Sequence, residues 1–143
     1  MGTAKPYFLY PGFAFVAYPN RDSTPFRERY NIPEAKIVVR GTLRHQGFPE
    51  MIRVLVDIEF LSEQERGFLS EKPIPWREAT GRIIGATSDK ETDLLWAITS
   101  KTQFPNNEER DRIFAALRWI GLFSATEQII PRKTPLDTLC ATL

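Results

Sequence analysis

The sequence predicts an α+β protein, in which short β-strands come first and a mostly α-helical part follows. Up to residue 45, one stretch is aromatic and strand-prone, and another, "KIVVRGTLR", has the two-residue period of a strand. After residue 45 they recur at helical spacing, and helix-start and helix-stop signals become frequent. We therefore expect a partial α/β segment at residues 1–45 and an α-helical domain at residues 46–143.

The first elements expected are strands. The stretch "YFLYPGFAFVAYP" (7–19) is aromatic and strand-prone, and its Pro-Gly pair divides it into two extended pieces. A later stretch, "KIVVRGTLR", alternates so that Arg40, Thr42 and Arg44 share one face of a strand. Between the two, "STPFRERYNIP" (23–33) predicts one or two helical turns that start at its first proline.

Helices are expected throughout the second domain, because apolar residues stand three or four positions apart there. The segments are "PEMIRVLVDIEFL", "PWREATGRIIG", one after the capping box "SDKE", one after the weaker cap "NNEE", and "TPLDTLCATL". In the first of them, Leu55, Val56 and Ile58 belong to the predicted apolar stripe. Gly85 is expected to stop the second.

The aromatic and terminal parts of this domain carry further expectations. Trp76, Trp96 and Trp119 fall on helical stretches and are expected to be core or half-buried. The polar stretches 61–73 and 124–133 are expected to be connectors. The last helix has apolar residues at helical spacing, Leu136, Leu139, Cys140 and Leu143, and the chain stops without a helix-stop signal. We therefore expect the domain to be truncated at its C-terminus.

Composition excludes several classes of function. With 143 residues and 42% hydrophobic content the chain can bury a core, and its net charge of +1 gives no field that would draw it to nucleic acid or a membrane surface. One cysteine and one histidine exclude an internal disulfide and a metal site of the usual ligand count. Neither a membrane-spanning apolar run nor a signal peptide is present, so we expect a cytoplasmic protein. No Gly-rich phosphate motif occurs, so no cofactor-binding residue is expected.

The chemistry-bearing pattern is a group of cations at residues 21–44. Six Lys and Arg side chains stand there against three acidic ones. Guanidinium groups pair bidentately with carboxylates, and a threonine hydroxyl can complete the carboxylate's shell, so Arg40, Thr42 and Arg44 could bind an anion. The alternative is that these arginines make ordinary surface ion pairs, which are common and usually inert.

The residues also resemble a known family. The stretches "GFAFVAYPNRDSTPFRERYNIPEAKIVVRGTLRHQGFPE", "LRWIGLFS" and "TPLDTLCATL" resemble the middle and C-terminal part of saccharopine dehydrogenases of the NADP(+), L-glutamate-forming type, also called saccharopine reductases. The likeness runs through the whole chain. "PNRDS" and "RGTLR" are also similar to the saccharopine dehydrogenase part of aminoadipate-semialdehyde synthase. The resemblance implies an oxidoreductase of lysine biosynthesis, which condenses L-2-aminoadipate 6-semialdehyde with L-glutamate and reduces the imine with NADPH to saccharopine.

The resemblance also implies site residues. It makes Arg21 in "PNRDS", and Thr42, Leu43 and Arg44 in "TLR", substrate-binding residues; the catalytic residues stay unknown. It places NADP(H) on a Rossmann domain that this chain lacks, so the chain alone should be inactive, and it implies no metal. At position 45 the resemblance leads us to expect tyrosine rather than His45, and at position 59 glycine rather than Glu59.

Three functions stay open at this point. The chain is the substrate-binding and helical portion of a saccharopine reductase, a truncated paralogue acting as an interaction module, or a helical nucleic-acid binder. The near-zero net charge weighs against the third. Saccharopine, or glutamate with aminoadipate semialdehyde, is the expected ligand of the first. Exposed strands should also favour self-association or docking with the missing enzyme domains.

Overall fold

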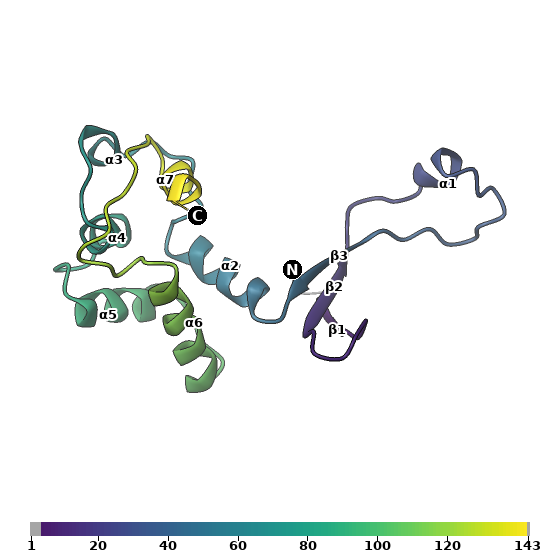
Figure 1. The fold of residues 1–143 in the computed structure, drawn as a ribbon, viewed down its shortest axis with the longest axis horizontal. Helices are drawn as coiled ribbons and strands as arrows, with labels where there is room; N and C mark the ends of the chain where they lie inside the picture. Colours follow the sequence, from purple (N-terminus) through teal and green to yellow (C-terminus); the bar gives the residue numbers. More distant parts are fainter. Residues whose placement is uncertain (1–3, 143) are drawn as a thin grey trace. The chain divides into compact units, whose positions relative to one another are not determined.

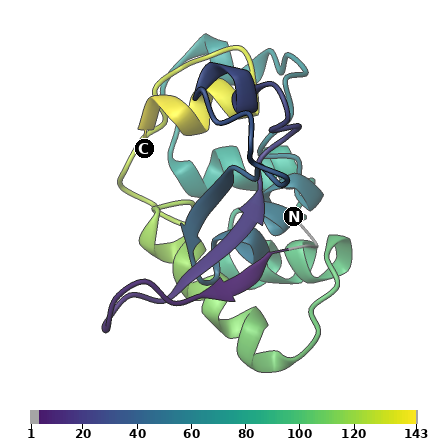
Figure 2. The ribbon, with the colours of Figure 1, turned by 90° about the vertical axis from the view of Figure 1, so that its right-hand side faces the viewer.

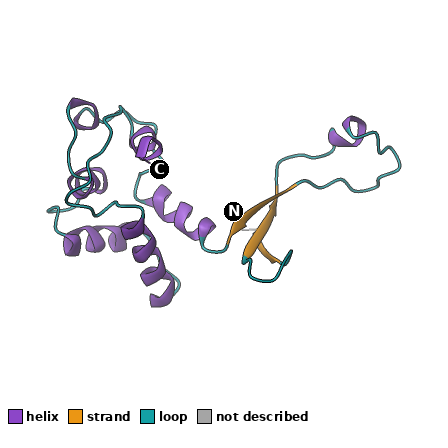
Figure 3. Cartoon of the chain, viewed as in Figure 1, coloured by secondary structure: helices purple, strands orange, loops and turns teal. Residues whose placement is uncertain are grey.

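The computed structural model describes residues 4–142 and divides the chain into two compact units, Met1–Pro49 and Glu50–Leu143. The described elements, in order, are β1 (Lys5–Tyr7), β2 (Phe15–Pro19), α1 (Phe26–Arg29), β3 (Gly41–His45), α2 (Phe48–Asp57), α3 (Phe68–Glu71), α4 (Trp76–Ile84), α5 (Glu91–Lys101), α6 (Asn107–Trp119) and α7 (Pro135–Thr142). Strands therefore precede a larger set of helices, and the predicted α+β class is confirmed (Figures 1 and 3).

The sheet of the first unit has the order β1-β2-β3, and both strand pairs are antiparallel (Figure 2). β1 and β2 are joined by the predicted Pro-Gly turn, in which Gly12 has a φ of 88°. In the β2–β3 ladder, Phe15 pairs with His45 and Tyr18 with Thr42. The predicted strand "KIVVRGTLR" is therefore confirmed only from Gly41 onward, because residues 36–40 lie outside β3 and Arg40 immediately precedes it.

A long excursion separates β2 from β3 and carries α1 (Figure 1). The backbone N–H of Asn20 donates to the carbonyl of Arg40 at 2.8 Å, which continues the ladder one step beyond the Pro19–Gly41 pair. The helix begins at Phe26 with Pro25 as its N-cap, one residue later than predicted. Pro25 makes no side-chain cap hydrogen bond, and Ser23 and Thr24 form the preceding turn through their carbonyls, which accept from the Phe26 and Arg27 N–H groups at 3.1 Å each.

The second unit is built on one apolar core, to which α2, α4, α5 and α6 all contribute. Within α2, Leu55 and Ile58 are buried as predicted, but Val56 is 56% exposed, so its assignment to the buried stripe was wrong. Val54 is buried instead, because it lies one helical turn before Ile58 on the same face. The predicted stop of α4 is confirmed, since Gly85 takes the left-handed conformation with a φ of 70°.

Helix caps follow the sequence signals at two of the four predicted N-termini; at the first, described above, Pro25 is the N-cap rather than Ser23 or Thr24. The Asn106 side chain accepts from the Glu109 N–H at 2.8 Å, and the Thr134 hydroxyl accepts from the Asp137 N–H at 3.0 Å. The capping box at Ser88 is wrong: α5 starts later, with Lys90 as its N-cap. The Ser88 hydroxyl instead accepts from the Lys90 N–H and donates to an Asp93 carboxylate oxygen at 2.6 Å. A competing side-chain acceptor therefore moved the helix start.

Tryptophan burial was predicted correctly at one position only. Trp76 is 1% exposed, whereas Trp96 and Trp119 are 68% and 87% exposed, so placing those two in or near the core was wrong. α5 buries Leu94 and Ile98, and Trp96 lies two residues from each, about 200° around the helix. Its position on the helix thus points it to solvent.

Two further expectations meet the structure near the chain's polar stretches. The stretch 61–73 was expected to be a connector, but Phe68–Glu71 within it forms α3, whose Leu69 is fully buried. In α7, Leu139 is buried and Cys140 is exposed, while Leu143 lies outside the described residues. Within residues 4–142, no helix is both long and apolar enough to cross a membrane.

Candidate functional site

The predicted site residues of the first unit lie in two places. Thr42, Leu43 and Arg44 lie on β3, and Arg21 lies in the segment that follows β2. Thr42 lies opposite Tyr18 and Arg44 opposite Val16 in the β2–β3 ladder, so Thr42 and Arg44 share a face of the sheet. Leu43 lies opposite Ala17 and therefore points to the other face. The strand thus brings together two of the three "TLR" side chains and turns the third away.

The face on the Leu43 side is apolar and open. It holds a hollow of about 780 Å³, whose lining includes Tyr7, Leu9, Val39 and Leu43. The side chain of Leu43 is 38% exposed there. Its backbone does take part on the Arg44 side, because its carbonyl accepts from Arg44 Nη1 at 2.9 Å. Leu43 can therefore contact the face that carries Thr42 and Arg44 only through its main chain.

Arg44 is held loosely in place by its neighbours. Besides the bond to the Leu43 carbonyl, its guanidinium lies 5.4 Å from the centre of the Phe48 ring, which is a cation–π distance. Arg44 is exposed, and no carboxylate within 4.0 Å pairs with it among the described residues. Most of its donors thus remain free for a ligand.

Arg21 stands two residues after the end of β2, in an unusual backbone conformation. Its φ is 51°, in the left-handed region, which costs a residue other than glycine about 1–2 kcal/mol. Such residues persist only where the surroundings over-determine them, and they concentrate at functional sites. The side chain of Arg21 is exposed. Its backbone is thus fixed while its charge is presented to solvent.

Asp22, the acidic neighbour of Arg21, is occupied by a local turn. Its carboxylate accepts from the Thr24 N–H at 2.9 Å and from the Thr24 hydroxyl at 2.8 Å. The backbone hydrogen bond, followed by the hydroxyl, lowers the pKa of Asp22 below its ordinary value, so the group is charged at neutral pH. It nevertheless makes no ion pair with Arg21 within the described residues.

Ion pairs are confined to the second unit. The nine pairs found among residues 4–142 all join residues from Arg53 onward, so none of the six cations at positions 21–44 has a carboxylate within 4.0 Å. The alternative that these arginines make ordinary surface pairs is therefore not observed. Instead, Arg27 donates to the Pro33 carbonyl and Arg40 lies over the Phe26 ring. The cations are free to neutralise an external anion.

The register shows how far the candidate residues are spread. At about 3.4 Å per residue, Thr42 and Arg44 lie about 7 Å apart along β3. Arg21 follows Pro19, which pairs with Gly41, so it lies beyond the opposite end of the strand from Arg44. Arg21 and Arg44 therefore lie toward opposite ends of β3 rather than around one point. This separation suits a ligand with separated negative groups.

The described residues contain no group of three His, Cys, Asp or Glu side chains placed to hold a metal ion. A dinucleotide would need a Gly-rich turn between a parallel strand and a helix, and the sheet described here is antiparallel. His45, the lone histidine, is exposed and packs at 5.0 Å from the Phe15 ring. The described residues therefore do not fit NADP(H).

Comparisons with known proteins identify the family and the fold of the chain. The family described as Saccharopine dehydrogenase C-terminal domain matches residues 1–143. A saccharopine dehydrogenase [NADP(+), L-glutamate-forming] of Pyricularia oryzae is 62% identical over 100% of this chain and 31% of its own length. A solved structure of apo histidine-tagged saccharopine dehydrogenase (L-Glu forming) from Saccharomyces cerevisiae is 52% identical, with a TM-score of 0.89 over 99% of this chain and 32% of that one.

A more distant relative is the mitochondrial alpha-aminoadipic semialdehyde synthase of Bos taurus. It is 28% identical over 97% of this chain and 15% of its own length. The chain spans about a third of the length of the fungal proteins that it matches. The activity of those whole proteins therefore involves more residues than the ones described here.

Proposed function

Because the chain belongs to the family of saccharopine dehydrogenase C-terminal domains, we propose that it is the substrate-binding and helical portion of an L-glutamate-forming saccharopine dehydrogenase. The proposed enzyme condenses L-2-aminoadipate 6-semialdehyde with L-glutamate and reduces the imine with NADPH to saccharopine. In this proposal the nucleotide is held by parts of the protein that correspond to the rest of the relatives' length. Residues 4–142 hold the anionic substrate.

The observation that carries this proposal is that Arg21 and Arg44 in the first unit have no carboxylate partner among residues 4–142. Saccharopine has three carboxylates, spread along an extended molecule. Arg21 and Arg44 lie toward opposite ends of β3, so each could bind a different carboxylate. Thr42 shares the face of Arg44 and supplies a hydroxyl to the same shell. Leu43 contributes the carbonyl that holds the Arg44 guanidinium.

The proposal can be tested in a chimera, in which this chain replaces the matching segment of the Pyricularia oryzae relative. We expect the chimera to oxidise saccharopine with NADP(+). Arg21→Ala and Arg44→Ala should each raise the KM for saccharopine about 10- to 100-fold, because each loses a charge-assisted contact of about 1.5–3 kcal/mol. The KM for NADP(+) should stay unchanged in both variants.

The matched control is Arg132→Ala. Arg132 is an exposed arginine whose Nη1 donates to the preceding carbonyl at 2.8 Å, as Arg44 Nη1 does at 2.9 Å, but it lies in the second unit. Its removal should leave the KM for saccharopine unchanged. A folded chimera without activity would favour the interaction-module alternative. Unchanged saccharopine KM values in both site variants would contradict the site.

A further inference from the structure

We propose that Arg40 is a positioning residue for Arg21, an inference that rests on the proposed function. Arg40 immediately precedes β3, and three contacts attach it to the beginning of the excursion that follows β2. Arg21 stands within the attached segment. None of these contacts uses the Arg21 side chain, so they can fix its backbone while leaving its guanidinium free.

Two of the contacts are hydrogen bonds from the main chain of Arg40. Its carbonyl accepts from the Asn20 N–H at 2.8 Å, and its N–H donates to the Ser23 hydroxyl oxygen at 3.0 Å. Asn20 and Ser23 flank Arg21 on either side. Ser23 is only 7% exposed, whereas Arg21 and Asp22 are exposed. The segment is therefore anchored by a buried acceptor on one side and by the ladder on the other.

The third contact is made by the Arg40 side chain. Its guanidinium lies 3.8 Å from the centre of the Phe26 ring, which is close for a cation–π contact. The Phe26 N–H in turn donates to the Ser23 carbonyl at 3.1 Å. Arg40 therefore holds Ser23 both directly and through Phe26, at the start of α1.

The purpose of this arrangement follows from the backbone of Arg21. A φ of 51° is unfavourable for an arginine, so a free segment would leave this conformation and point the side chain elsewhere. The ties from Asn20 and Ser23 to Arg40 keep Arg21 in the conformation observed. A side chain ordered before the ligand arrives does not lose that freedom on binding, and affinity increases.

The test uses Ser23→Ala in the chimera, because this change removes the acceptor and leaves every arginine in place. We expect the KM for saccharopine to rise about three- to tenfold, the loss of one hydrogen bond, with kcat within about twofold. Ser23→Thr, which keeps the hydroxyl, should recover part of the loss. In an Arg21→Ala background, Ser23→Ala should change the KM by less than about twofold, since its effect passes through Arg21.

The matched control is Thr24→Ala. Thr24 is a neighbouring hydroxyl residue, but its side chain bonds to Asp22 within the segment and not to Arg40. The KM for saccharopine should be unchanged in this variant. Circular dichroism of each variant establishes that it is folded. If Ser23→Ala does not fold, Arg40→Met decides: it keeps the main-chain bonds, removes the Phe26 contact, and should raise the KM about two- to fivefold.

The outcomes separate this inference from the proposed function. A normal KM in Ser23→Ala, with a raised KM in Arg21→Ala, overturns the positioning role and leaves the substrate site standing. The same conclusion follows if Ser23→Ala is equally harmful with and without Arg21. Normal KM values in Ser23→Ala and Arg21→Ala, with a raised KM in Arg44→Ala, remove Arg21 from the site and overturn the positioning role. Normal KM values in Arg44→Ala as well overturn the substrate site itself.

Discussion

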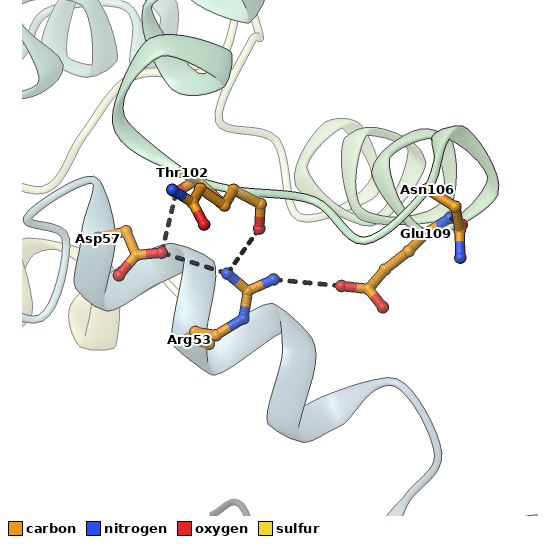
Figure 4. Close-up of polar contacts among 6 residues, drawn as sticks. Arg53, Asp57, Thr102, Asn106 and Glu109 are labelled. Carbon is orange, nitrogen blue, oxygen red and sulfur yellow. Dashed lines mark hydrogen bonds and ion pairs between the residues drawn. The ribbon is translucent and has the colours of Figure 1, made fainter.

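Replacing Arg53 by methionine should destabilise the second unit by about 2 kcal/mol, mostly by leaving one carboxylate without its partner. Arg53 lies on α2 and its guanidinium contacts residues around the start of α6 (Figure 4). Nη1 donates to the Gln103 carbonyl at 3.0 Å and to an Asp57 oxygen at 3.4 Å, and Nη2 donates to Glu109 Oε1 at 3.1 Å.

The three contacts differ in what their loss would cost. The Glu109 side chain is only 14% exposed, so an unpaired charge there is poorly hydrated and costs about 1.5–3 kcal/mol. The contact to Asp57 is long, and Asp57 keeps the Thr102 hydroxyl at 3.0 Å. The Gln103 carbonyl is in an exposed residue and can bond to water instead. Methionine retains the apolar stem of arginine, so little packing is lost.

Urea unfolding of the chain, followed by far-ultraviolet circular dichroism, measures the effect without adding salt. Glu109→Gln and the double variant complete a mutant cycle, in which we expect a coupling of about 1–2 kcal/mol. Arg110→Met is the control, because its partner Asp111 is 65% exposed, and it should cost less than about 1 kcal/mol. An Arg53→Met variant within about 0.5 kcal/mol of the parent would refute the reasoning, since Glu109 would then be well hydrated without Arg53.

Two other predictions concern the ends of helices. Gly85→Ala should lower the free energy of unfolding by about 1 kcal/mol, because φ is 70° while no atom within 4 Å would meet the added Cβ; an unchanged midpoint in urea would contradict the strain. Glu59 accepts from Lys101 at 3.2 Å and from Arg66 at 2.6 Å, and the Lys101 bond is the main cause of its lowered pKa. The ionised Glu59 carboxylate therefore stabilises the fold at pH values above its pKa in the unfolded chain, and this contribution is lost as the pH falls through its lower pKa in the folded chain. Between about pH 5 and pH 3, the parent should therefore lose more stability than Glu59→Gln. Parallel losses in the two proteins would show that the carboxylate is not stabilised by folding.

The sequence predicted the helices and strands better than it predicted which of their residues face solvent. The alternation over residues 41–44 and the stop at Gly85 are local signals, and both were confirmed, whereas the predicted strand at residues 36–40 was not. Trp96 shows the limit, because α5 has apolar residues around most of its circumference and the sequence alone does not say which of them meet other helices. The expectation of a glycine at position 59 has a structural counterpart: Glu59 has a φ of 67°.

The candidate site divides in the same way. The cation excess at residues 21–44 was visible in the sequence, and so was the shared face of Thr42 and Arg44. The hydrogen bond from the Arg40 N–H to the Ser23 hydroxyl joins residues 17 positions apart, and neither residue type indicates such a contact. Contacts of this kind depend on where the chain returns after an excursion, which propensity and periodicity do not encode.

Among residues 4–142, ion pairs are confined to the second unit. The two units also differ in net charge, and this difference affects how a charged ligand reaches the first. Residues 1–49 have seven Lys and Arg against three acidic side chains, whereas residues 50–143 have twelve against fifteen. The net charge of +1 is thus the sum of a positive charge on the first unit and a negative charge on the second. A ligand with several carboxylates is attracted by the field of the first unit and repelled by that of the second before it touches either. Its rate of encounter should therefore fall as salt shortens the Debye length, even where the contacts made after arrival stay the same.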